Sequence, residues 1–153
     1  MSRAAQAAFS YRGDPAVPSF PDDRPIVIFD GKCVLCSGFA RFILRADRGG
    51  RIRLMAAQSR LGMALYRHFG LDLVDYETNI LLVNGQAWFE SEASIRIFAI
   101  LGFPWSSVSL FRLLPLTLRD RLYRIVARNR LRWFGRRETC YLPDPAHADR
   151  FLD

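Results

Sequence analysis

The fold is indicated most clearly by residues 26–36, which read Ile26-Val27-Ile28-Phe29-Asp30-Gly31-Lys32-Cys33-Val34-Leu35-Cys36. Its first four residues are apolar and predict a buried strand, and Asp30-Gly31 predicts a turn after it. Apolar residues then recur every three or four positions from Leu35 to Ala46, which predicts a helix that ends at Gly49-Gly50. The sequence therefore places two cysteines, three positions apart, where a strand gives way to a helix.

A Cys-x-x-Cys pair in this position is typical of proteins that exchange disulfides. A free cysteine is mostly protonated at neutral pH, because its pKa is about 8.5. The unpaired N–H groups and the dipole at the start of a helix stabilise a thiolate at Cys33. The spacing brings Cys36 onto nearly the same helix face. We therefore expect Cys33 to attack a substrate disulfide and Cys36 to resolve the mixed disulfide.

Two charged neighbours of the pair each have two interpretations. Lys32 lowers the pKa of Cys33 if its side chain points at the sulfur, and is otherwise a solvated lysine. Asp30 either accepts or relays a proton during resolution, or it has a structural part in the turn or the helix cap. The structural part is favoured for Asp30, because aspartate fills it routinely.

The rest of the chain alternates strands and helices. Strands are predicted at 51–55, 79–83 and 86–89, the last two joined by an Asn84-Gly85 hairpin turn, and helices at 61–69 and 91–101. The order β-α-β-α-β-β-α predicts a thioredoxin-like three-layer α/β/α fold with a mixed four-stranded sheet and extra C-terminal helices. Sites in such sheets gather at the carboxyl ends of parallel strands. We expect Ser91, which is also a good N-cap, and Glu92 to fall near that end and to contact substrate.

The stretch Asp30–Cys36 resembles the Asp-x-x-Cys-x-x-Cys motif of the DCC family of predicted thiol-disulfide oxidoreductases. The similarity covers about residues 25–152, and its further segments are Arg48–Ser59, the hairpin, Ser91–Ser94, Val126–Arg130, Phe134–Arg137 and Cys140–Pro143. The resemblance implies a thioredoxin-like fold and a redox-active dithiol, and it supplies no substrate. The resembling family often carries a cysteine at the position of Cys140. Cys140 is thus an alternative resolving group or, as we favour, a buried inert cysteine.

The chain departs from the better-known thioredoxins in two places. Those proteins have a cis-proline before the third core strand, facing the dithiol, whereas residues 75–79 here contain no proline. The dipeptide between the cysteines is Val34-Leu35 rather than Gly-Pro, and this dipeptide influences the reduction potential. The usual substrate-presenting element is therefore absent.

Composition bounds the setting. At 153 residues the chain is long enough for one domain with an ample core. Residues 1–24 are expected to form a disordered leader, and 25–153 a single thioredoxin-like domain. An odd number of cysteines without a secretory signal favours a reducing compartment, the cytoplasm. No segment reaches the ~18 uncharged apolar residues needed to span a bilayer.

A C-terminal extension, about residues 104–137, is rich in arginine. Helices are expected to begin at Pro104 and Pro115 and to cover one face of the sheet, the second with an apolar stripe of Leu118, Leu122, Ile125 and Val126. Arg112–Arg137 contains nine arginines and one acid, Asp120. Such a block can bind nucleic acid or an anionic membrane. We favour a solvated helix face, because arginines at helical spacing also describe an amphipathic surface helix.

The cysteine pair is also half of a zinc site. The remaining ligands would be Cys140 with His147, or His68, and their spacing fits poorly. We predict a thiol-disulfide oxidoreductase with no cofactor beyond the Cys33–Cys36 disulfide. Its partners would be a protein or small-molecule disulfide or dithiol and an unidentified reductant. The alternatives are a redox-inactive module that binds nucleic acid or an anionic membrane, and a zinc-stabilised structural domain.

Overall fold

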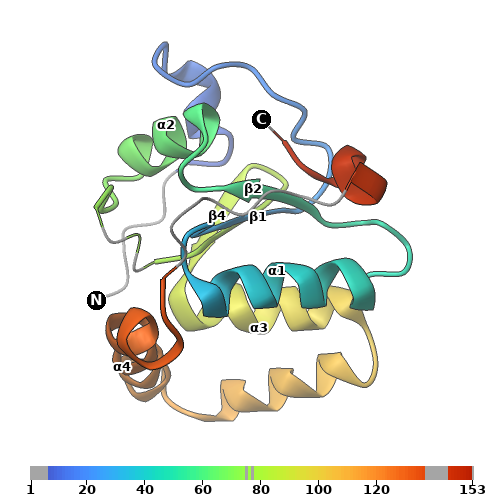
Figure 1. Ribbon diagram of the computed structural model, residues 1–153, viewed down its shortest axis with the longest axis vertical. Coiled ribbons are helices and arrows are strands. Elements are labelled where there is room, and N and C mark those ends of the chain that lie inside the picture. Colours follow the sequence, from blue (N-terminus) through green and yellow to red (C-terminus); the bar gives the residue numbers. More distant parts are fainter. Residues whose placement is uncertain (1–6, 75, 77, 137–144, 153) are drawn as a thin grey trace.

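The computed structural model describes residues 7–74, 76, 78–136 and 145–152. A four-stranded sheet lies at its centre, in the order β2-β1-β3-β4 (Figure 1). The strands are β1 (Ile26–Phe29), β2 (Arg53–Ala56), β3 (Ile80–Val83) and β4 (Gln86–Phe89). β1 is parallel to β2 and antiparallel to β3, which is antiparallel to β4. The predicted mixed sheet is confirmed.

Helices cover both faces of this sheet. α1 (Val34–Ala46) and α3 (Glu90–Leu101) lie on one face, and α2 (Arg60–His68) lies on the other (Figure 1). Side chains of β1 alternate between the two cores: Ile26 and Ile28 pack on the α2 side, and Val27 and Phe29 on the α1 and α3 side. The predicted thioredoxin-like α/β/α architecture is confirmed.

The hairpin between β3 and β4 forms where the sequence predicts it. Asn84 and Gly85 both have positive φ, 51° and 76°, as a two-residue type I′ turn requires. This turn fixes the register, in which Ile80 faces Phe89 and Val83 faces Gln86.

Residues 7–24 correct the expectation of a disordered leader. They include a short 3₁₀ helix, η1 (Ser10–Gly13), and the Tyr11 side chain is 2% exposed within the core on the α2 side. His68 at the end of α2 holds this segment through Asp14 at 2.8 Å and Ser10 at 2.9 Å. Apolar side chains between the prolines, Tyr11 above all, therefore anchor this segment on the core.

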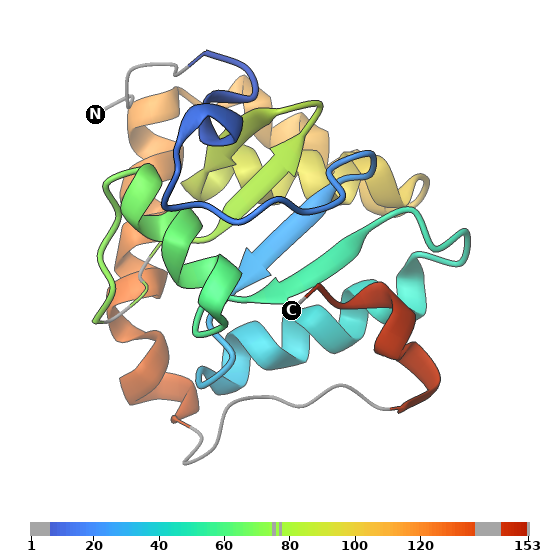
Figure 2. The same cartoon turned by 90° about the horizontal axis from the view of Figure 1, so that it is seen from above.

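The C-terminal extension begins with a 3₁₀ helix, η2 (Trp105–Leu113), packed on α3, and continues as α4 (Leu116–Phe134). α4 crosses the end of the sheet at which β1 finishes, instead of covering a face (Figure 2). It buries Asp120, Ala127 and Arg130, while the apolar stripe expected on this helix is exposed. The predicted covering of one face is therefore wrong for α4. The groups at the end of the sheet are polar, and they select the polar side of α4.

Near the end of the described chain, η3 (Pro145–Arg150) is followed by Phe151, which forms an isolated parallel bridge with Leu54 of β2. Arg150 donates to the Ile52 carbonyl and pairs with the buried Asp47 at 2.7 Å. Leu152 donates its N–H to the Leu54 carbonyl at 2.9 Å. Within the described ranges, no helix is both long and apolar enough to cross a membrane.

Candidate functional site: a dithiol at the start of α1

The two cysteines lie at the start of α1, as the sequence predicts. Cys33 is the N-cap residue, and its sulfur accepts the backbone N–H of Cys36 at 3.3 Å. Both cysteines are free thiols in this structure. The pair therefore has the short separation and the helix-start geometry that a reversible disulfide needs.

Hydrogen bonds hold the pKa of Cys33 at about 6, well below its ordinary value. The largest cause is the hydrogen bond from the Cys36 side chain, and the Cys36 backbone N–H and the charge of Arg130 act in the same direction. Burial and the charge of Asp30 oppose them. At neutral pH Cys33 is thus mainly thiolate, the form that attacks disulfides.

The same contacts raise the pKa of Cys36 far above its ordinary value. The hydrogen bond to Cys33 is the first cause, followed by burial and the Cys33 charge. Two of these three causes depend on an anionic Cys33 sulfur. Cys36 is therefore the protonated member of the pair while Cys33 is a free thiolate.

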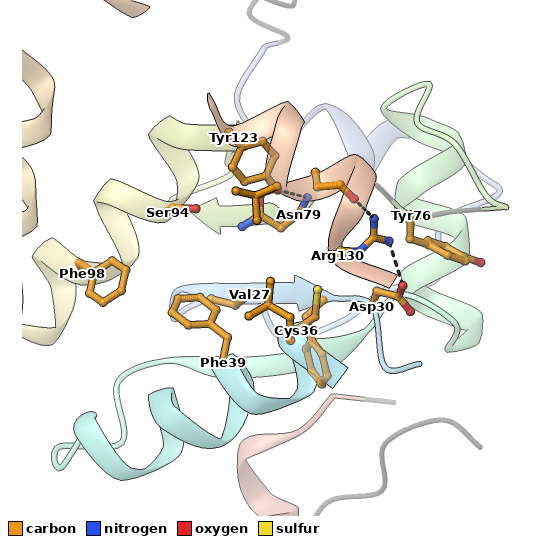
Figure 3. A pocket seen from close by; sticks show the side chains of 14 residues that line it. Val27, Asp30, Cys36, Phe39, Tyr76, Asn79, Ser94, Phe98, Tyr123 and Arg130 are labelled. Atoms are coloured by element: carbon orange, nitrogen blue, oxygen red, sulfur yellow. Dashed lines mark hydrogen bonds and ion pairs between the residues drawn. The ribbon is translucent and has the colours of Figure 1, made fainter. Parts of the chain in front are cut away.

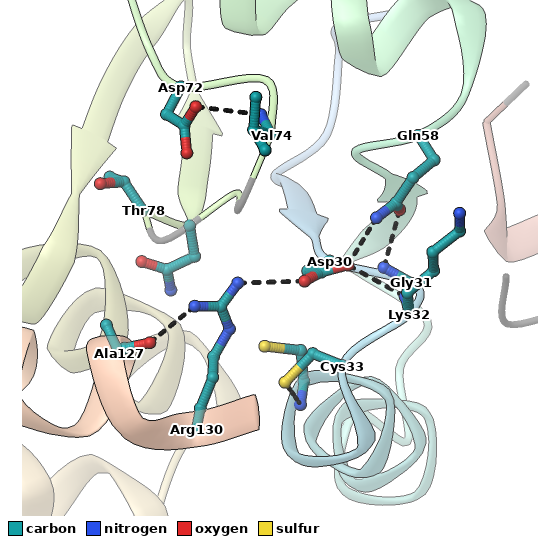
Figure 4. A network of polar contacts seen from close by, with 12 residues as sticks. Asp30, Gly31, Lys32, Cys33, Gln58, Asp72, Val74, Thr78, Ala127 and Arg130 are labelled. Atoms are coloured by element: carbon teal, nitrogen blue, oxygen red, sulfur yellow. Dashed lines mark hydrogen bonds and ion pairs between the residues drawn. The ribbon is translucent and has the colours of Figure 1, made fainter. Parts of the chain in front are cut away.

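Asp30 is the centre of a polar network beside the pair (Figure 4). Its carboxylate accepts hydrogen bonds from the Lys32 backbone N–H at 3.0 Å and from the Gln58 side chain, and pairs with Arg130 at 3.0 Å. Gln58 also accepts the Gly31 N–H at 2.9 Å. These contacts fix the turn between β1 and α1. They support the structural role of Asp30 that the sequence analysis favours.

A cavity of about 300 Å³ opens beside the pair, and Figure 3 shows the Cys36 sulfur pointing into it. Its walls are mostly apolar, with Phe39, Phe98 and Val126 among them. The polar groups that reach it are those of Asp30, Cys36, Asn79, Ser94, Tyr123 and Arg130. Small-molecule sites commonly combine an apolar wall with a few placed polar groups. The cavity can therefore receive an apolar group next to the dithiol.

A short strap, Gly135–Arg136, lies against Cys33. Arg136 forms an isolated antiparallel bridge with Cys33, and the Val34 N–H donates to the Gly135 carbonyl at 3.3 Å. Cys33 is 0% exposed, whereas Cys36 is partly exposed. Cys33, which carries the thiolate, is therefore covered in this structure. A substrate sulfur can reach it only if the strap moves away.

The side chains of Lys32, Ser91 and Glu92, the other candidate site residues, do not contact the dithiol. The Lys32 side chain points away from the sulfurs (Figure 4). Ser91 donates to the buried Asp120 of α4. Glu92 pairs with Arg96 within α3, with Arg112 of η2 and with Arg119 of α4, so both side chains help to join α3 to its neighbours. Neither lines the cavity, although Ser94 does. The N-cap of α3 is Phe89 rather than Ser91.

Cys140 lies outside the described residues. Among the residues that are described, no three His, Cys, Asp or Glu side chains come together as metal ligands. His68 holds the N-terminal segment instead.

The sequence did not single out Arg130, Gln58, Asn79 or Tyr123 for this site. Tyr123 donates to the Asn79 side chain at 2.7 Å and accepts its backbone N–H at 3.2 Å, which fastens α4 to the start of β3. Arg130 lies one hundred residues from Asp30, so no local pattern marks the pair. The only hint of Arg130 in the sequence is the motif aspartate Asp30, because an aspartate that is buried on folding needs a cationic partner.

Comparisons with known proteins agree with this geometry. The family model for DCC1-like thiol-disulfide oxidoreductases matches residues 27–136, from β1 to the strap. The uncharacterized protein YuxK of Bacillus subtilis is 36% identical over 127 residues, covering 83% of this chain and 93% of the relative. A chloroplastic DCC family protein of Arabidopsis thaliana is 38% identical over 122 residues, covering 79% and 71%. No solved structure matches. With its cysteine pair, its motif aspartate and Arg130 all inside the matched region, this chain belongs to the DCC1-like thiol-disulfide oxidoreductase family.

Proposed function

We propose that the chain is an enzyme that exchanges disulfides through a mixed disulfide on Cys33. The observation that supports this most directly is the Cys33 sulfur at the N-cap of α1, hydrogen-bonded by Cys36 and with a pKa of about 6. The family assignment supports the general reaction class. The nucleophile, the resolving residue and the substrate are the parts that we add.

In the forward direction the Cys33 thiolate attacks one sulfur of a substrate disulfide, and the other sulfur leaves as a thiolate. The hydrogen-bond acceptor and the negative charge that raise the pKa of Cys36 are then lost. Cys36 gives up its proton more readily at this step, and Asp30, on the same cavity wall, is a candidate acceptor. The Cys36 thiolate attacks the Cys33 sulfur, which releases the reduced substrate and leaves a Cys33–Cys36 disulfide. An external reductant restores the dithiol.

Access to Cys33 requires the strap to move. Near Cys33, the bridge to Arg136 and one hydrogen bond from Val34 hold Gly135–Arg136 in place. We propose that an apolar group of the substrate occupies the cavity beside Cys36 while the strap opens. A protein side chain and a small organic disulfide both satisfy this requirement. We place the exchange in a reducing compartment, the cytoplasm, because such a compartment regenerates the dithiol.

The direct test compares single serine variants in the reduction of a model disulfide such as insulin. Cys33→Ser removes the nucleophile and abolishes turnover. Cys36→Ser retains the first attack, so it accumulates a mixed disulfide on Cys33 that a mass measurement detects. Turnover that survives in Cys36→Ser and disappears in Cys36→Ser/Cys140→Ser assigns resolution to Cys140 instead.

Two further results would contradict the proposal. One is a dithiol that alkylates with the pH profile of free cysteine. The other is one equivalent of zinc in protein purified with reductant, which would favour the zinc-stabilised domain.

A further inference from the structure

The outward face of α4 combines exposed apolar side chains with arginines. Leu118, Leu122, Ile125 and Trp133 are 42%, 50%, 46% and 55% exposed. Their successive spacings of four, three and eight residues place them along one side of the helix. The opposite side holds the buried residues of α4. α4 is therefore an amphipathic helix whose apolar stripe faces away from the protein core.

Arginines run along one flank of this stripe. Arg121, Arg128 and Arg132 are spaced seven and four residues apart, and all three are exposed. Other arginines of α4 are used internally: Arg119 pairs with Glu92 and Arg124 with Glu90.

The one acid of α4 does not balance this flank. Asp120 is buried and accepts a hydrogen bond from Ser91. The outward face of α4 therefore carries cationic and apolar groups without an acidic residue.

We infer that this face of α4 docks on an anionic lipid bilayer, with the helix lying in the plane of the interface. Leucine, isoleucine and tryptophan on one side with arginine beside them is the composition of interfacial helices. Lipid headgroups supply the negative charge that the arginines lack, and acyl chains cover the exposed leucines.

The same observations disfavour two other occupants. Nucleic acid would neutralise Arg121, Arg128 and Arg132, but phosphates offer nothing to Leu122 or Ile125. A two-fold symmetric dimer through this face would cover the leucines, but it would set the arginines of one copy against those of the other, because α4 presents no acidic side chain there.

The inference rests on exposed residues and is independent of the dithiol chemistry. The experiment is flotation of the full chain with vesicles of phosphatidylcholine alone or mixed with phosphatidylglycerol. We expect binding to the mixed vesicles, weakened by salt, and a blue shift of tryptophan fluorescence that Trp133→Phe abolishes.

Matched variants separate the contributions. Arg121→Gln/Arg128→Gln/Arg132→Gln should weaken vesicle binding by about a hundredfold, since each arginine contributes about a factor of five near such a surface. As a control, Arg41→Gln/Arg45→Gln/Arg48→Gln removes the same charge from two exposed positions of α1 and one in the turn just after it, and should retain most of the binding.

Replacing two apolar residues of the stripe tests whether acyl chains contribute to vesicle binding. Leu122→Ser/Ile125→Ser should weaken binding while leaving disulfide reduction unchanged, so failure here does not touch the proposed function. Equal binding to both vesicle types, equal loss in the α1 triple variant, tighter binding to nucleic acid, or a dimer that Leu122→Ser/Ile125→Ser dissolves would each overturn the inference.

Discussion

Arg130 Nη2 lies 3.0 Å from Asp30 Oδ2, with the two side chains 4% and 5% exposed and one hundred residues between them in the chain. The pair joins α4 to the turn that precedes the dithiol. Both charges act on Cys33, the cation lowering its pKa and the anion raising it. One ion pair therefore links the stability of the fold to the chemistry of the site.

Removing one partner of this ion pair should lower the free energy of unfolding more than removing both partners together. Asp30→Asn or Arg130→Met alone leaves one buried charge without its counterion, with an expected loss of about 3–5 kcal/mol. The double variant should be more stable than the two single effects added together. Urea unfolding of the four proteins in reductant measures this coupling, and strictly additive losses would show that the pair contributes nothing as a unit.

Alkylation of the reduced protein should follow the Cys33 thiolate. Because the pKa of Cys33 is about 6, the rate should rise between pH 5 and 7 and level off above that range. Iodoacetamide kinetics across pH, with Cys33→Ser as control, check this prediction. A midpoint near the ordinary thiol value in the unmodified chain would contradict it. Relative to the unmodified chain, Arg130→Met should move the midpoint up and Asp30→Asn should move it down.

The strap should control access to Cys33. Gly135 has φ of 95°, which a residue with a Cβ rarely adopts, so Gly135→Ala strains the strap by about 1–2 kcal/mol. We expect alkylation of Cys33 at pH 8 to become up to about tenfold faster, because the open form is more populated. An unchanged rate in a variant whose unfolding midpoint is lowered by this strain would show that the strap does not limit entry.

The N-terminal segment should be part of the folded core. Tyr11→Ala removes a fully packed aromatic ring and its hydrogen bond to Asp22, with an expected loss of about 3–5 kcal/mol. Arg12→Ala, next to it and largely exposed, should cost much less stability than Tyr11→Ala. Thermal unfolding distinguishes them, and equal small losses would indicate a segment that does not contribute to the core.

The sequence predicted those parts of the fold whose signal is local. β1, the start of α1 and the Asn84-Gly85 turn each follow from a few adjacent residues, and all three are present. The orientation of α4 could not be predicted in this way. Apolar periodicity identified the correct stripe, but the end of the sheet presents Asp30, Asn79 and Ser91, and these groups bind the opposite side of the helix.

For the site, too, the sequence predicted only the residues whose signal is local. The cysteine pair follows from its spacing and its place after a strand, whereas Arg130 depends on tertiary contact across most of the chain. Tyr11 was missed for a related reason, because three nearby prolines hid the effect of one well-packed ring.

The position of α4 sets a lower limit on the length of a working redox unit. A fragment that stopped at Leu101 would keep all four strands and both cysteines, and would look complete by its secondary structure. It would lack the only described cation paired with Asp30, one wall of the cavity and the cover over Cys33. Truncated variants should therefore retain the chain through Arg136, because the C-terminal extension supplies an ion-pair partner, part of the cavity wall and a cover for the dithiol.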